Sequence, residues 1–109
     1  MSAKEPERQF ERFTLDWQGI ALSVSYEEHW LGVEHVSPFA TAHFEVRVID
    51  PDNHIIPITE TSYRSHFVHR DVVRKFGGPA DFVIAWLEEA AQSPEWKARL
   101  DRHRQFSLF

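Results

Sequence analysis

Histidine is the residue type that most directly suggests a chemistry for this chain, because imidazole is the commonest metal ligand in proteins. There are seven histidines, and the closest pair is His66 and His69 in the segment HFVH, followed by the wider pair His29 and His35. A spacing of three brings two ligands together on a helix, but the neighbouring residues predict a strand, where positions i and i+3 point to opposite faces. Since neither an HExxH segment nor a carboxylate on the same face accompanies the pair, we expect no metal site and no cofactor.

The residues that could support catalysis are not arranged for it. Ser62 and Ser65 lie in an extended segment without an adjacent glycine, whereas a serine nucleophile needs a sharp turn and a base within hydrogen-bond reach. The neighbouring carboxylates at 27–28 and 88–89 fall on segments that we expect to be exposed, where hydration explains them. We therefore assign no catalytic residue.

The densest group of polar and aromatic side chains lies in the segment ITETSYRSHF, residues 58–67. Arginine, tyrosine and histidine together provide hydrogen-bond donors beside flat amphipathic rings, which is typical of recognition surfaces. The sequence therefore predicts a partner-binding surface that contains Glu60, Tyr63, Arg64 and His66. The alternative is an ordinary strand whose polar side is hydrated and whose Tyr63 and Phe67 belong to the core. Strand alternation places Arg64 and His66 on the face opposite Tyr63 and Phe67.

The tail, residues 105–109, has the sequence QFSLF and carries large apolar residues. Chain ends are usually polar and frayed unless something ties them down. The tail therefore either packs on the core of this protein or enters a pocket of another protein.

The tail resembles the bacterial sliding-clamp-binding pentapeptide, whose pattern is Gln-Leu-Ser/Asp-Leu-Phe at or near a chain terminus. Four of the five positions match, and Phe106 departs from the pattern at a position that bears on affinity. The resemblance implies that the DNA sliding clamp is a partner, with Gln105 hydrogen-bonded at the rim of a hydrophobic pocket and Leu108 and Phe109 inside it.

A second resemblance covers residues 41–109. The segment TETSYRSHF, the GGP that precedes an AWL helix, and the final LF are similar to segments of small proteins carried on plasmids and integrative elements of proteobacteria. This resemblance implies a mobile-element protein but no particular activity.

Composition and charge limit the class of protein. With 109 residues, 42% of them hydrophobic, the chain predicts a single globular domain over 1–109. The absence of cysteine excludes disulfides and thiol nucleophiles, and the charged start predicts a flexible N-terminus over 1–10 rather than a signal peptide or membrane anchor. We expect a cytoplasmic protein, and the net charge of −5 argues against direct nucleic-acid binding by the body, the part that precedes the tail.

The elements that would position these residues follow from periodicity. Alternating apolar residues predict strands at 13–17, 20–26 and 41–48. A fourth extended segment begins at Ile55 and continues to Val68, and Pro57 restricts it to an edge of the sheet. The period then changes, and we predict a short helix closed by Gly77, a second helix over 79–92, and a third from an N-cap at Ser93 to about 103. The fold class is therefore α+β, with an antiparallel sheet of three to five strands packed against two or three C-terminal helices. We expect a helix stripe of Ala80, Val83, Ile84, Leu87 and Ala91, and a core that contains Phe44, Val46, Val48, Ile84, Leu87 and Trp86 or Phe82.

Two classes of function remain. The first is a non-enzymatic adaptor or regulator that docks on the sliding clamp through its tail and uses its body as the effector surface. The second is a mobile-element accessory protein or host-defence inhibitor that binds a protein through its acidic body alone. A small enzyme with an unrecognised active site is the third.

Overall fold

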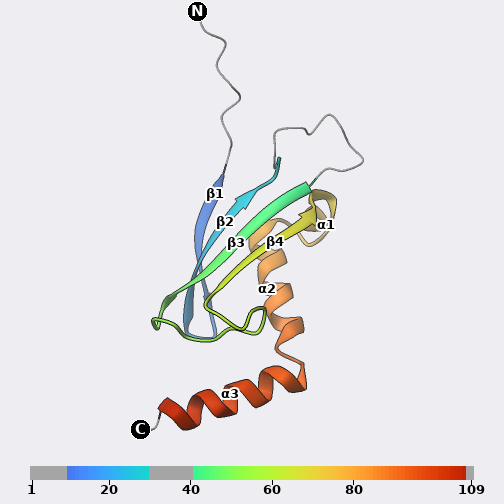
Figure 1. Ribbon diagram of the computed structural model, residues 1–109. Helices are drawn as coiled ribbons and strands as arrows, with labels where there is room; N and C mark the ends of the chain where they lie inside the picture. Colours follow the sequence, from blue (N-terminus) through green and yellow to red (C-terminus); the bar gives the residue numbers. More distant parts are fainter. Residues whose placement is uncertain (1–9, 30–40, 108–109) are drawn as a thin grey trace, which may run out of the picture.

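The computed structural model describes residues 10–29 and 41–107, with the backbone alone for residues 106 and 107. Four strands come first: β1 (Glu11–Trp17), β2 (Ile20–Glu27), β3 (Thr41–Asp50) and β4 (Tyr63–His69). Three helices follow: α1 (Arg70–Lys75), α2 (Pro79–Ala90) and α3 (Pro94–Ser107). The strands form one antiparallel sheet in the order β1-β2-β3-β4 (Figure 1). The predicted α+β class, with strands before helices, is confirmed.

The first hairpin forms because its two turn residues accept positive φ. Gln18 and Gly19 have φ values of 52° and 81°, and the amide of Gly19 donates to the Asp16 carboxylate at 3.0 Å. This turn pairs Trp17 with Ile20 and fixes the register, so that Leu15 lies opposite Leu22 and Phe13 opposite Val24.

The fourth strand is shorter than the sequence predicts. Ile56 and Thr59 form only an isolated bridge, and β4 begins at Tyr63. The hydroxyls of Thr59 and Thr61 both donate to the carbonyl of Tyr63, at 3.0 and 2.9 Å, which favours a compact loop over an extended strand. The prediction that the strand begins at Ile55 is therefore wrong, although Ile56 and Ile58 are buried as loop residues in the core.

The glycine, proline and serine residues at the helix ends act as the sequence predicts, although α2 ends at Ala90 rather than at residue 92 and α3 continues beyond residue 103. Gly77, with φ of 103°, closes α1, and the amides of Gly77 and Gly78 donate to the carbonyls of Arg74 and Val73, which is the Schellman arrangement. Pro79 opens α2, and the hydroxyl of Ser93 accepts from the amide of Trp96 at 3.1 Å to cap α3. No helix in the described part of the chain is long and apolar enough to cross a membrane.

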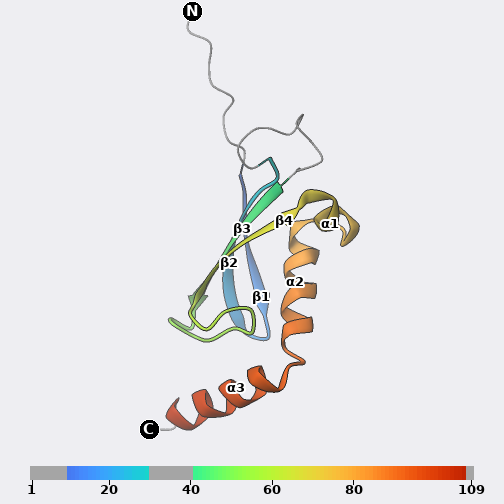
Figure 2. The same ribbon diagram turned by 45° about the vertical axis from the view of Figure 1, so that its right-hand side comes forward.

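One face of the sheet packs against α2, and we call it the inner face (Figures 1 and 2). Val24, Phe44 and Val46 are fully buried there, together with Val83 and Leu87 of α2. Most of the predicted core is confirmed, but Ile84 is 36% exposed. Phe82 and Trp86 stack beside Phe44 and His66, so these larger aromatic rings turn the helix and carry Ile84 outward.

Candidate functional site

No helix in the described part of the chain covers the opposite, outer face of the sheet (Figure 1). Strand alternation and register place six side chains of β3 and β4 next to one another on this face. The pairs are His43 with Phe67, Glu45 with Ser65, and Arg47 with Tyr63. We call these six residues the outer-face cluster.

An imidazole–phenyl stack forms one end of the cluster. The rings of His43 and Phe67 lie 4.4 Å apart at an angle of 23°, and His43 Nε2 lies 2.7 Å from Ser65 Oγ. Phe67 is nevertheless 50% exposed, which is unusual for a phenylalanine. The stack and the hydrogen bond therefore hold an aromatic ring at the protein surface in a fixed orientation.

A second aromatic group, with charged neighbours, forms the other end of the cluster. The hydroxyl of Tyr63 donates to Glu45 Oε1 at 2.7 Å, and the guanidinium of Arg47 lies 4.7 Å from the centre of the Tyr63 ring. This hydrogen bond to a carboxylate favours the protonated phenol and raises the pKa of Tyr63 above its ordinary value. The ring is therefore held between an anion and a cation.

The other side chains of β4 point toward α2, as strand alternation predicts. The ring of His66 lies 4.3 Å from that of Trp86, and the guanidinium of Arg64 lies 5.6 Å from the same indole. Burial, followed by the nearby charge of Arg64, lowers the pKa of His66, which favours the neutral imidazole.

These positions divide the predicted body residues between two surfaces. Tyr63 lies on the outer face, whereas exposed Arg64 and partly buried His66 lie at the edge of α2, and Glu60 is exposed in the loop before β4. The alternative that Tyr63 and Phe67 belong to the core is wrong, because the core lies on the other face of β4.

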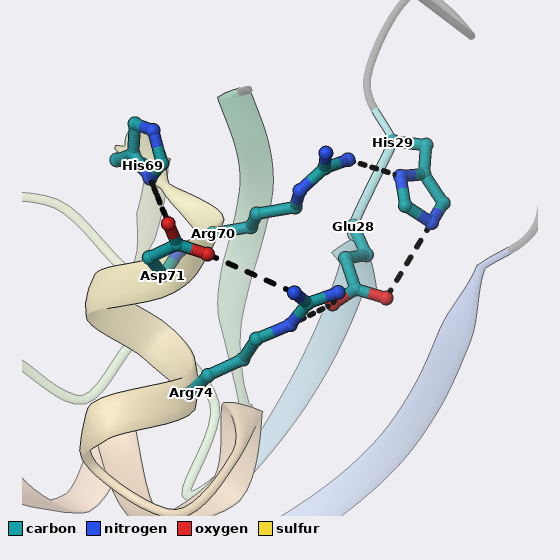
Figure 3. A network of polar contacts seen from close by, with 6 residues as sticks. All are labelled: Glu28, His29, His69, Arg70, Asp71 and Arg74. Atoms are coloured by element: carbon teal, nitrogen blue, oxygen red, sulfur yellow. Dashed lines mark hydrogen bonds and ion pairs between the residues drawn. The ribbon is translucent and has the colours of Figure 1, made fainter. Parts of the chain in front are cut away.

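A network of charged side chains connects α1 to the end of β2 (Figure 3). Arg74 donates to Glu28 through Nε at 2.9 Å and pairs with it through Nη2 at 2.7 Å. Arg70 Nη1 donates to His29 Nδ1 at 2.6 Å, and the other nitrogen of this imidazole lies 3.6 Å from Glu28. The contact with the Glu28 carboxylate also raises the pKa of Arg74.

The start of α1 completes the same network. His69 is the N-cap residue, and its Nδ1 accepts from the amide of Asp71 at 3.1 Å. The Asp71 carboxylate lies 3.7 Å from Arg74, one helical turn later (Figure 3). Apart from the His29–Glu28 pair, these contacts join α1 to its own N-cap and first turn or to the residues that directly follow β2, so the network explains how this short helix is positioned.

Residues 10–29 and 41–107 contain no group of three histidine, aspartate or glutamate side chains that could hold a metal ion. The structure therefore supplies no metal centre from the part of the chain that it describes.

The tail begins inside α3. This helix continues beyond the predicted end and includes residues 105–107, and the side chain of Gln105 is exposed. Leu108 and Phe109 lie outside the described residues, and so do residues 1–9 of the predicted flexible segment 1–10. Trp96 is buried, and Arg99 donates to the carbonyl of Thr59 at 2.6 Å, so α3 is attached to the body through its first half.

The comparison with protein families decides the identity of the domain. The family model of the KlcB third domain matches residues 10–96, which is most of the chain. This chain belongs to the KlcB third-domain family. KlcB proteins are carried on plasmids, so the predicted relation to mobile-element proteins is confirmed at this level. No curated protein and no solved structure matches the chain.

The KlcB match includes the whole sheet, α1, α2 and the first residues of α3. The outer-face cluster therefore lies entirely within the matched domain. The tail and the second half of α3 lie beyond the matched residues.

Sequence reasoning missed His43, Glu45 and Arg47 as site residues, although alternation already placed them on the hydrated side of a strand. The missing information was the pairing of β3 with β4, which sets them beside Tyr63 and Phe67. The polar face of one strand, taken together with the large aromatic residues of the adjacent strand, would have indicated these three residues.

Proposed function

We propose that this KlcB domain is a non-enzymatic protein-binding module and that its partner contacts the outer-face cluster. The observation that carries the proposal is the half-exposed ring of Phe67, held by His43 beside the Arg47–Tyr63 pair. Aromatic and arginine side chains dominate the binding energy of protein interfaces when they are gathered in one place.

The contacts within the cluster support tight binding. Hydrogen bonds to Glu45 and Ser65 orient Tyr63 and His43 before a partner arrives, so less side-chain entropy is lost on association. The cluster contains both an anion and a cation, which suits a protein surface of mixed charge better than the uniform negative charge of a nucleic acid. The overall charge of −5 also disfavours nucleic acid as the partner of the body.

Affinity capture with a matched pair of variants tests this proposal. Phe67 and Phe76 have nearly equal exposed fractions, 50% and 49%, but Phe76 follows α1 and packs edge-on against Phe82. We expect Phe67→Ala to reduce capture of the partner at least about tenfold and Phe76→Ala to leave it nearly unchanged. Equal capture by wild type and Phe67→Ala would contradict the proposal.

We further propose that the tail supplies a second contact, with the bacterial DNA sliding clamp, which would make the protein an adaptor. This proposal rests on the QFSLF pattern and on the exposed position of Gln105 in the last turns of α3. Because Gln105 is helical, the last turn would have to unwind for the pentapeptide to enter a pocket as an extended segment. The cost of unwinding a helix end is small because its last carbonyls lack intrahelical partners.

Calorimetric titration of the clamp with the intact protein and with a form lacking residues 105–109 tests the tail. We expect micromolar binding, roughly 6–8 kcal/mol, from the intact chain and none from the shortened one. We also expect nearly equal melting temperatures, because a tail that enters the pocket of another protein would not stabilise the body and Gln105 is exposed.

Three other results would refine or change the proposal. No binding heat together with a melting temperature about ten degrees lower in the shortened form would show that the tail packs on its own core. Loss of clamp binding with retained capture by the body would establish two independent contacts. No clamp binding with equal melting temperatures would favour the accessory or inhibitor function, in which the body acts alone.

A further inference from the structure

A cleft of about 400 Å³ lies where α3 passes the end of the sheet. Figures 1 and 2 both show α3 beneath the end that carries the β1–β2 turn. The lining residues come from this turn, from the segment after β3, and from one side of α3. The cleft shares no residue with the outer-face cluster, so an inference about it stands apart from the proposed protein interface.

Two tryptophans form the apolar part of the cleft. Trp17 and Trp96 are 3% and 4% exposed, and their rings lie 6.4 Å apart at an angle of 53°. Ile20 and Leu100 extend the same surface. Aromatic walls of this kind favour a flat ring, because offset and tilted ring pairs are stabilised beyond the burial of area.

One polar atom of these walls has no partner. Trp17 Nε1 is buried and lacks a hydrogen-bond acceptor among the described residues. A buried N–H without an acceptor is uncommon in folded proteins and calls for an explanation. A ligand atom that accepts a hydrogen bond would provide one only if the indole turned toward the cleft, because Nε1 is not accessible to solvent.

Cationic and titratable side chains also line the cleft. The rings of His54 and His103 are 4.7 Å apart, and Arg104 follows His103 on α3. His54 Nδ1 donates to the carbonyl of Ile55 at 2.8 Å, which leaves Nε2 for another partner. No aspartate or glutamate is among the described residues that line the cleft, so its charge is zero or positive.

We propose that this cleft binds a small planar aromatic anion, an aromatic carboxylate, with its ring against the wall that Trp17 and Trp96 form and its carboxylate toward His103 and Arg104. The volume lies within the range of small-molecule sites, roughly 300–1,000 Å³. Arginine binds a carboxylate in a two-point hydrogen-bonded geometry, which would fix the orientation of the ring.

Nuclear magnetic resonance of the intact, ¹⁵N-labelled protein tests the proposal with 2-naphthoate as the probe. The chain has four tryptophans, so the indole N–H signals of Trp17, Trp96 and Trp86 are assigned with Trp17→Phe, Trp96→Phe and Trp86→Phe, and that of Trp86 serves as an internal reference away from the cleft. We expect saturable shifts at Trp17 and Trp96, none at Trp86, and a dissociation constant below about 1 mM.

The neutral probe 2-naphthalenemethanol and a matched pair of arginine variants separate the role of charge from that of the ring. We expect the alcohol to bind about tenfold more weakly than the carboxylate. Arg104→Gln should weaken naphthoate about tenfold while leaving the alcohol unchanged, whereas Arg102→Gln, on the same helix but outside the cleft, should change neither.

Three results would overturn the proposal: no saturable shift, shifts at Trp86 rather than at the cleft tryptophans, or equal binding of the acid and the alcohol. An unchanged naphthoate affinity in a folded Arg104→Gln protein would also reject the carboxylate assignment.

Discussion

The two faces of the sheet use the same strands for different purposes. On the inner face, β3 contributes Ala42, Phe44 and Val46, each with no exposed surface. On the outer face, the same strand contributes His43, Glu45 and Arg47, which contact the side chains of β4 through stacking, hydrogen bonds and a cation–π contact. Successive residues of β3 therefore face a packed core and an ordered polar surface in turn.

The comparison teaches that large aromatic residues in a strand do not identify the core by themselves. Phe44 is fully buried and Phe67 is half exposed, although both lie in strands of alternating sequence. The inner face holds the fold together, and the outer face is the surface that we propose for a partner. The following predictions test this division, from the largest effect to the smallest.

Phe44→Ala should cause the largest loss of stability. The Phe44 ring is stacked 5.1 Å from that of Phe82 and lies 4.6 Å from that of Tyr26, so its removal leaves a cavity in the centre of the core. We expect the free energy of unfolding to fall by about 3–5 kcal/mol in denaturant titrations. A loss below about 1 kcal/mol would mean that the inner face is not the main core.

Tyr26 should make stability depend on alkaline pH. Burial raises the pKa of Tyr26 from 10.0 to about 12, so the unfolded chain loses this proton at a lower pH than the folded protein does. The stability that the protonated Tyr26 contributes to the folded protein is fully present below pH 10 and is lost as the pH rises toward 12. The free energy of unfolding should therefore fall by about 2 kcal/mol across this interval.

Tyr26→Phe provides the control for this alkaline effect. Its free energy of unfolding should lack the part of the alkaline pH dependence that comes from Tyr26. The difference in free energy of unfolding between wild type and variant therefore isolates this phenol from the lysines and arginines that titrate in the same pH range. Parallel curves for the two proteins above about pH 10 would contradict the account. Phenylalanine should not reduce stability at neutral pH, because the Tyr26 hydroxyl is buried without a partner among the described residues.

Phe67→Ala should have little effect on stability and a large effect on binding. Half of the Phe67 ring is exposed, so we expect the free energy of unfolding to change by less than about 1 kcal/mol while partner capture falls at least about tenfold. Denaturant titration next to Phe44→Ala measures the first quantity. A loss as large as that of Phe44→Ala would identify Phe67 as a core residue and remove the distinction between the faces.

Glu45→Gln should produce the smallest effect, a change in one pKa. The hydrogen bond from Tyr63 to the Glu45 carboxylate raises the pKa of Tyr63, so the neutral amide should lower this pKa toward its ordinary value. The absorbance of tyrosinate, followed in the Tyr26→Phe background, reports Tyr63 alone because the chain has two tyrosines. An unchanged titration curve would show that the outer-face hydrogen bond does not persist in solution.

Much of the fold was predictable because local signals agreed with the final packing. Alternation located β1, β2 and β3, the Gly77–Gly78 pair ended α1, and Pro79 and Ser93 marked the starts of the next two helices. Two details depended on tertiary contacts instead. The hydroxyls of Thr59 and Thr61 hold a loop where apolar residues suggested a strand, and Phe82 and Trp86 displace Ile84 from the core.

The site was less predictable than the fold. The segment 58–67 contained Tyr63 and Phe67, but a single strand does not reveal which of its faces a helix covers. The partners His43, Glu45 and Arg47 are about twenty residues distant in sequence and meet them only through the β3–β4 register. The contacts of Arg70 and Arg74 with the end of β2 also required the three-dimensional structure.

Site-specific photo-cross-linking tests the central claim most directly. A benzophenone amino acid replaces either Phe67 or Phe76, which are almost equally exposed on different surfaces, in cells that naturally produce the protein. The account predicts a discrete protein adduct from position 67 and none from position 76. An adduct from position 76 alone, equal adducts from both positions, or nucleic acid as the product at position 67 would contradict the assignment of the outer face as a protein-binding surface.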